Sequence, residues 1–88
     1  MRRSYEIVNK LGLHARAAAQ FVKLASSFEA ELEIAKGSET VNGKSIMGIM
    51  MLAASKGCTV DLNATGEDAE ALLDALGELI TAKFYEGQ

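Results

Sequence analysis

The sequence has 88 residues, with no proline, no tryptophan, one cysteine and one histidine. A single cysteine excludes a disulfide within the chain. Together with the lack of a secretory leader, it predicts a cytoplasmic protein. No apolar run approaches the roughly 20 residues that span a membrane, so membrane insertion is not expected. The formal net charge of −3, without a basic stripe, argues against general nucleic-acid binding, which depends on neutralising phosphates.

The length predicts one domain, residues 1–88, with a single core layer and no deep substrate cavity. A composition of 49% hydrophobic and 24% charged residues is typical of an ordinary globular protein. No internal repeat or linker divides the chain, and a monomer is the expected state.

Alternating polar and apolar residues predict four strands, and apolar residues at helical spacing predict three helices. The predicted strands are 5–8, 31–35, 40–42 and 58–64, and the predicted helices are about 15–27, 45–52 and a segment that starts at 65–68 and runs to about residue 80. The last helix is expected to carry Glu67 and Asp68 in its first turn, where the helix dipole favours acids.

The order β-α-β-β-α-β-α predicts an α+β fold, in which a four-stranded, mainly antiparallel sheet carries three helices on one face. Each predicted helix has one apolar stripe and each strand one apolar face, so this packing buries all of them together. The opposite face of the sheet is left to water, which suits its polar residues Glu31, Glu33, Asp61 and Asn63.

His14, the only histidine, comes directly before the predicted helix at 15–27. The first backbone N–H groups of a helix lack intrahelical partners, and the helix dipole is positive there, so an anion is favoured. We expect the N–H groups of Ala15, Arg16 and Ala17 to bind a phosphate, and the Arg16 guanidinium to donate to it. The positive helix end also disfavours imidazolium, which leaves His14 a nucleophilic nitrogen.

Position alone leaves a simpler alternative open, in which His14 is a helix-capping or solvated residue. A metal site is not expected, because the chain has no second histidine and only one cysteine. A Ser-His-Asp hydrolase is not supported either, because nothing resembles a nucleophile elbow. No cofactor is predicted.

Two stretches resemble the HPr family, the histidine-containing phosphocarriers of the bacterial phosphoenolpyruvate-dependent sugar phosphotransferase system. NKLGLHAR (residues 9–16) resembles the family's active-site motif, and GKSIMGIM (43–50) resembles its regulatory serine segment. AASKG (53–57) and ATGED (64–68) resemble further family blocks in the expected order. The resemblance covers nearly the whole chain.

The resemblance implies an open-faced β-sandwich and a phosphoryl carrier rather than an enzyme. It implies that enzyme I phosphorylates His14 on Nδ1, using phosphoenolpyruvate, and that the group then passes to enzyme IIA proteins. Arg16 would assist the phosphoryl group. The resemblance also implies that HPr kinase/phosphorylase acts on Ser45.

The segment around Ser45 has too many apolar residues for a helix of about two turns to bury on one side. We expect Met47 or Met50 to be exposed near His14, where methionine suits docking of several partners; core filling is the alternative. Ser45 can cap this helix, and a phosphate there adds charge beside the docking patch and weakens partner binding. Lys44 is a candidate for acidic-partner recognition, with simple solvation as its alternative.

One departure from the family concerns residue 17, where the family usually has proline and this chain has Ala17. Alanine keeps the helix but adds a donor and some backbone freedom. Three functions stay open: a carrier for sugar uptake, a regulatory carrier of the nitrogen-type branch, and an interaction module that is not phosphorylated.

Overall fold

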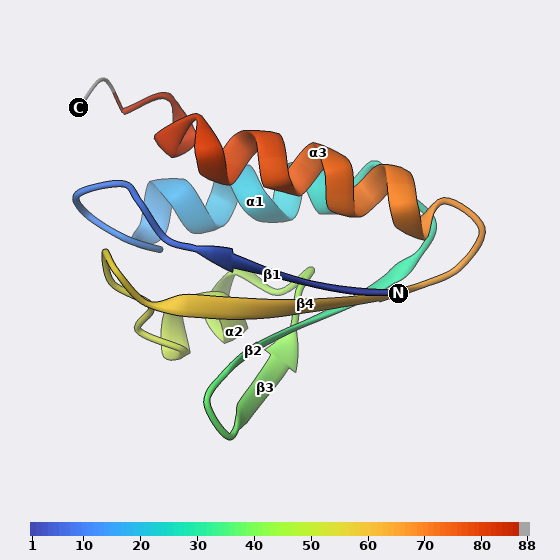
Figure 1. Ribbon diagram of the computed structural model, residues 1–88, viewed down its shortest axis with the longest axis horizontal. Helices are drawn as coiled ribbons and strands as arrows, with labels where there is room; N and C mark the ends of the chain where they lie inside the picture. The colour runs from blue at the N-terminus through green and yellow to red at the C-terminus, as the bar shows by residue number, and fades with distance from the viewer. Residues whose placement is uncertain (87–88) are drawn as a thin grey trace.

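The computed structural model describes residues 1–86 and consists of one antiparallel sheet with helices packed on it (Figure 1). The strands are β1 (Arg2–Glu6), β2 (Glu31–Lys36), β3 (Glu39–Asn42) and β4 (Thr59–Thr65). The helices are α1 (Ala15–Ser26), α2 (Ile46–Met51) and α3 (Ala69–Thr81), followed by a one-turn 3₁₀ helix, η1 (Lys83–Tyr85). The sheet order is β1-β4-β2-β3 and every pairing is antiparallel.

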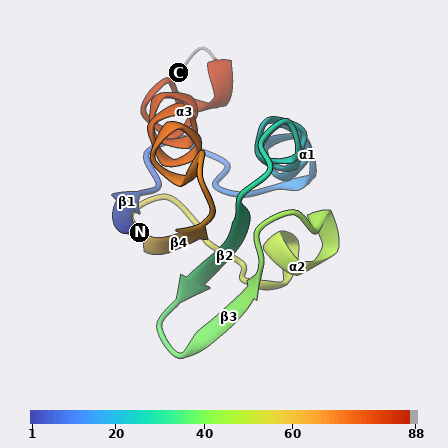
Figure 2. The same cartoon turned by 90° about the vertical axis from the view of Figure 1, so that its right-hand side faces the viewer.

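The three α-helices lie side by side and leave the other face of the sheet open, as Figure 2 shows end-on. α1 contacts both α3 and α2, while α3 packs on β1 and β4 and α2 packs on β3. The α+β fold class predicted from the sequence is therefore confirmed.

The apolar periodicities decide which residues enter the core. In β2, Leu32 and Ile34 are buried while Glu31 and Glu33 are exposed, as strand alternation requires. The predicted stripe of the last helix is buried in α3, at Ala69, Leu72, Leu73, Leu76 and Ile80. The predicted open face is also found, with Glu31, Glu33 and Asn63 exposed and Asp61 half-buried.

The boundaries of the first strand were predicted wrongly. The sequence placed a strand at 5–8, but β1 ends at Glu6 after pairing with β4 from Arg2 onward. Ile7 is fully buried, and its N–H donates to the Cys58 carbonyl just beyond the ladder. Polar residues at the edge of the sheet hide the strand from a pattern based on apolar residues.

Asp68 also differs from its prediction as an acid within the first turn. It lies at the N-cap of α3 without capping it, and Glu70 is the acid in the first turn. The Asp68 carboxylate instead accepts from the N–H groups of Glu29 and Ala30, at 2.8 Å each, just before β2. These bonds, the Glu29 bond foremost, lower the pKa of Asp68, so this carboxylate ties two distant segments together.

η1 was not predicted. Its three residues, Lys83, Phe84 and Tyr85, all have φ between 53° and 59°. Left-handed backbone costs roughly 1–2 kcal/mol per non-glycine residue. Phe84 offsets part of this cost because the residue is only 1% exposed and lies in the core. The turn redirects the chain after α3.

Within residues 1–86, no helix is long and apolar enough to cross a membrane.

Candidate functional site

A tight loop between β1 and α1 presents His14. Gly12 has φ +66°, and a Cβ there would lie 2.5 Å from the Ala54 carbonyl oxygen. The neighbouring Leu13 N–H donates to that same carbonyl at 2.9 Å. The close approach of the two backbones explains the glycine in the NKLGLHAR stretch, and it fixes the loop against the segment that follows α2.

His14 is the N-cap residue of α1, with extended backbone at φ −75° and ψ −179°. Its carbonyl accepts the first intrahelical bond, from Ala18 N–H at 2.8 Å, but its side chain caps no backbone group. The three predicted phosphate-binding residues, Ala15, Arg16 and Ala17, therefore form the first turn of α1, where helical N–H groups have no carbonyl partner within the helix. The sequence placed this helix start correctly.

The imidazole of His14 instead contacts a carboxylate from the C-terminal end of the described chain. His14 Nε2 lies 2.5 Å from Glu86 Oε2. The His14 side chain is 26% exposed and that of Glu86 only 6%. The blue loop that leads to α1 and the red turn after α3 meet at one end of the molecule, which Figure 1 shows.

Asn9 connects the same carboxylate to the loop. Its fully buried side chain donates from Nδ2 to the Gly12 carbonyl at 2.9 Å and to Glu86 Oε2 at 3.1 Å. Both partners are acceptors, which fixes the orientation of the amide. The hydrogen bond with His14, the bond from Asn9 and the charge of Arg16 all lower the pKa of Glu86, while burial opposes them. Glu86 is thus held as a carboxylate.

Arg16 lies on the exposed side of the first turn of α1. Its guanidinium is close enough to lower the pKa of Glu86 through its charge. Among the described residues, the structure shows no hydrogen bond between Arg16 and His14. Arg16 therefore lies near the contact between His14 and Glu86.

The apolar residues of α2 form an exposed patch, which we call the α2 patch: Ile46, Met47, Met50 and Met51. Met47 is 73% exposed and Met50 43% exposed, which confirms the expected exposure, whereas Ile49 and Leu52 are buried. α2 packs on α1, and the chain after α2 meets Leu13. The α2 patch therefore flanks the His14 loop.

Ser45 is the N-cap of α2, as predicted. Its Oγ accepts from Gly48 N–H at 3.0 Å. A Cβ on Gly48 would lie 3.2 Å from Ser45 Oγ and 3.3 Å from Val41 Cβ, so the cap and the sheet explain the glycine in this short helix. The predicted docking residue Lys44 is half-buried, and its Nζ donates to the Phe28 carbonyl at 2.8 Å. Lys44 thus helps to hold the chain before β2.

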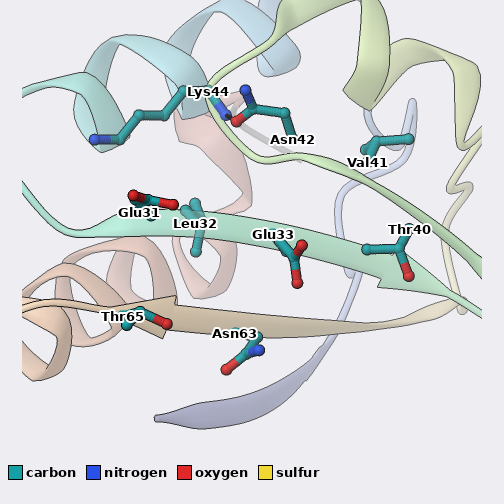
Figure 3. A pocket seen from close by; sticks show the side chains of 9 residues that line it. All are labelled: Glu31, Leu32, Glu33, Thr40, Val41, Asn42, Lys44, Asn63 and Thr65. Carbon is teal, nitrogen blue, oxygen red and sulfur yellow. Dashed lines mark hydrogen bonds between the residues drawn. The ribbon is translucent and has the colours of Figure 1, made fainter.

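A hollow on the open face of the sheet is a rival location for a site. Figure 3 shows its lining side chains, which come from β2, β3, β4 and the turn before α2. They include the carboxylates of Glu31 and Glu33 but no histidine or cysteine. Within residues 1–86, no three or more His, Cys, Asp or Glu residues gather where they could hold a metal ion. His14 therefore stays the candidate site.

Sequence reasoning missed Glu86 and the role of Asn9. Asn9 was noted only as part of the NKLGLHAR stretch, and Glu86 follows a turn that no glycine marks. The one available signal is Phe84, a large apolar residue beyond the stripe of α3, which requires the chain to turn back toward the core.

Comparisons with known proteins show what the whole chain is similar to. A family model described as "PTS HPr component phosphorylation site" matches residues 1–82. The phosphocarrier protein HPr of Neisseria meningitidis is 49% identical over 88 residues, 100% of this chain and 99% of that protein. The phosphocarrier protein NPr of Shewanella violacea is 45% identical over 86 residues, 98% of this chain and 94% of that protein. The crystal structure of HPr-C-His from Thermoanaerobacter tengcongensis has a TM-score of 0.96 and 48% identity, covering 100% of this chain and 99% of that one.

Proposed function

The chain belongs to the HPr family of phosphocarrier proteins, and on this premise we propose that His14 accepts a phosphoryl group from enzyme I, with phosphoenolpyruvate as its source, and passes it to enzyme IIA for sugar uptake. The observation that carries the proposal is the place of His14 at the N-terminus of α1, with its side chain turned away from capping. The chain is then a stoichiometric carrier that is charged and discharged once per cycle.

The proposed acceptor atom is Nδ1, because Nε2 is engaged by Glu86. A phosphoryl group on Nδ1 would meet the N–H groups of the first turn of α1 and the guanidinium of Arg16. Dipole stabilisation at a helix end is worth roughly 0.3–1 kcal/mol, and a hydrogen bond to a charged group roughly 1.5–3 kcal/mol. Stabilisation of this size holds the group but still allows release to an acceptor.

The direct test is incubation with enzyme I and labelled phosphoenolpyruvate. We expect one acid-labile, base-stable phosphate per chain, absent in His14→Ala. A known carrier labelled in parallel serves as the positive control. Failure to label this chain while the control is labelled would refute the carrier role.

A regulatory carrier is the second candidate, and the 45% identity to a phosphocarrier protein NPr favours keeping it. Both candidates use the same chemistry at His14 and differ in the acceptor. Complementation of a strain that lacks its sugar carrier separates them, because only a carrier that discharges to sugar-specific enzyme IIA proteins restores growth.

We further propose that the α2 patch docks partners and that HPr kinase/phosphorylase regulates docking through Ser45. A phosphate on Ser45 would add a charge of roughly −1.5 to −2 at neutral pH, beside the exposed methionines. Ser45→Asp should weaken the binding of enzyme I, as measured by calorimetry, while the fold persists. Ser45→Ala should bind enzyme I normally. Equal affinity of both variants would contradict the proposal.

Met47 and Met50 are the proposed contact residues of the α2 patch. Lys44 should contribute less to docking, because its ammonium group is bonded within the chain. Met47→Ala should weaken partner binding more than Lys44→Ala does.

Cytoplasmic location and a monomeric state remain predictions, which fractionation and sedimentation can test.

A further inference from the structure

The segment after α3 returns to the His14 site through a turn of energetically unfavourable backbone conformation. Lys83, Phe84 and Tyr85 are all left-handed, although none is glycine. Residues in such backbone persist where surrounding structure holds them, and they concentrate at functional sites. Here the buried Phe84 ring anchors the turn, and the residue that it delivers to the site is Glu86.

The delivered carboxylate is embedded between two side chains. Its Oε2 lies 2.5 Å from His14 Nε2 and accepts from Asn9 Nδ2 at 3.1 Å. Asn9 is in turn bonded to Gly12, so the carboxylate is fixed to the loop that carries His14. A surface ion pair would leave both side chains in water, whereas the Glu86 side chain is 6% exposed.

We propose that Glu86 is a positioning residue for phosphoryl transfer: it keeps a proton on His14 Nε2, which leaves the lone pair on Nδ1, and it balances the charge that the ring gains. This role rests on the proposed carrier function and adds Glu86 to the residues that serve it. Which imidazole nitrogen carries the proton is set by the partner of the other nitrogen. A buried carboxylate that orients a catalytic histidine and stabilises its imidazolium is an arrangement known from serine proteases.

The transfer step then needs no proton movement on this chain. The Nδ1 lone pair forms the new bond to phosphorus, while the bond between phosphorus and the donor atom breaks and its electron pair leaves with the donor. The ring, which keeps its Nε2 proton, becomes a positively charged phosphoimidazolium facing Glu86. On discharge, the Nδ1–phosphorus bond breaks, its electron pair returns to Nδ1, and neutral imidazole is the leaving group.

A competing interpretation of the same contact is that Glu86 covers the site and must leave before transfer. The two ideas predict opposite effects when the charge is removed. A positioning carboxylate accelerates transfer, so its loss slows the reaction. A cover blocks transfer, so its loss speeds the reaction.

The test compares Glu86→Gln, Glu86→Asp and Glu78→Gln, the last removing an exposed charge on α3. Each variant is phosphorylated by phosphoramidate, a small nitrogen-linked phosphoryl donor, and separately by enzyme I with phosphoenolpyruvate. We expect Glu86→Gln to take up phosphate about tenfold more slowly from both donors, the scale of one lost charge-assisted hydrogen bond. Glu86→Asp should recover part of the rate, and Glu78→Gln should match the original chain.

Two readouts separate positioning from a purely structural role. Nitrogen-15 NMR of the His14 ring should show the proton on Nε2 in the original chain and a mixture of Nε2–H and Nδ1–H forms in Glu86→Gln. Hydrolysis of the phosphorylated form should shift its acid-labile limb to lower pH in Glu86→Gln, because the phosphoimidazolium loses its counter-charge. A structural role alone would move neither signal.

Unchanged or faster uptake in Glu86→Gln, or an unchanged ring tautomer, would overturn the proposal. If the original chain takes phosphate from neither donor, the carrier function itself fails. The tautomer measurement on the unphosphorylated protein still decides whether Glu86 sets the ring nitrogen, so the two failures are distinguishable.

Discussion

The first and second helices both begin at a polar N-cap residue, but they use its side chain differently. Ser45 caps α2 in the usual way, with Oγ accepting from Gly48 N–H at 3.0 Å. His14 makes no cap bond to α1, and its ring turns to Glu86. The shorter helix, of 6 residues, has the cap, and the longer helix, of 12 residues, does without it.

This difference shows where local stability has been given up. A side-chain cap is worth roughly 0.5–2 kcal/mol, and α1 lacks one although its first turn could accept it. The longer helix can forgo that stabilisation because Ala17, Ala18, Phe21 and Ala25 bury its inner face. The uncapped N–H groups of α1 are then available for a phosphoryl group, whereas those of α2 are partly used by the fold.

The strongest way to break the contrast is to give α1 an ordinary cap. His14→Ser removes the proposed acceptor nitrogen, so phosphate uptake from enzyme I should vanish completely. The serine can bond to the open N–H groups, so the free energy of unfolding in urea should stay within about 1 kcal/mol of the original value. Labelled uptake beside a urea titration tests both parts, and residual acid-labile phosphate in this variant would place the acceptor elsewhere.

The next effect concerns the loop that permits the uncapped start. Gly12→Ala would place a Cβ 2.5 Å from the Ala54 carbonyl oxygen, at φ +66°. Alanine tolerates this left-handed backbone poorly, and its Cβ would overlap the carbonyl oxygen. Together these effects should destabilise the chain by about 2–3 kcal/mol. Urea unfolding measures the loss. Gly37→Ala is a matched control, because Gly37 has φ +60° but nothing within 4 Å of a Cβ, and an equal loss in both variants would show that overlap plays no part.

Substitution of Arg16 tests whether its guanidinium acts together with the N–H groups of the first turn of α1. Arg16→Ala should slow transfer from enzyme I about tenfold, because one charge-assisted donor is lost. Arg16 is exposed, so thermal unfolding should be nearly unchanged. Arg16→Lys keeps the charge without the planar pair of donors and should fall between the two. Transfer kinetics at the original rate in Arg16→Ala would remove its assigned role.

A change at the start of α2 should lower stability and leave phosphate uptake unchanged, the opposite of the result expected for His14→Ser. Ser45→Ala removes the cap of α2 and should cost about 1 kcal/mol of unfolding free energy. Phosphate uptake by His14 should be unaffected, because Ser45 bonds within its own helix. Ser45→Asn, which retains a capping side chain, should recover most of the stability. A slower uptake in Ser45→Ala would show that the two helix starts are coupled.

The contrast between the two starts was only partly predictable from the sequence. The start of α1 at His14 and the cap at Ser45 follow from local patterns, since each depends on residues a few positions apart. The sheet and the stripe of α3 follow from apolar periodicity for the same reason. The Asp68 bonds to the chain before β2 and the Glu86 contact with His14 join residues far apart in sequence, and no local pattern encodes such pairs.

The smallest expected effect is a pH dependence at the His14 start. The hydrogen bond with His14, aided by the bond from Asn9, lowers the pKa of Glu86 below its ordinary value of 4.5. The unfolded chain therefore binds a proton more readily than the folded chain, so this contact stabilises the fold above about pH 4.5. Its contribution fades as the pH falls through the lower pKa of folded Glu86. Urea unfolding from about pH 6 to pH 3 should lose more stability in the original chain and in Glu78→Gln than in Glu86→Gln. Because Asp68 titrates alike in all three proteins, parallel slopes would mean that Glu86 is not held as a bonded carboxylate beside His14.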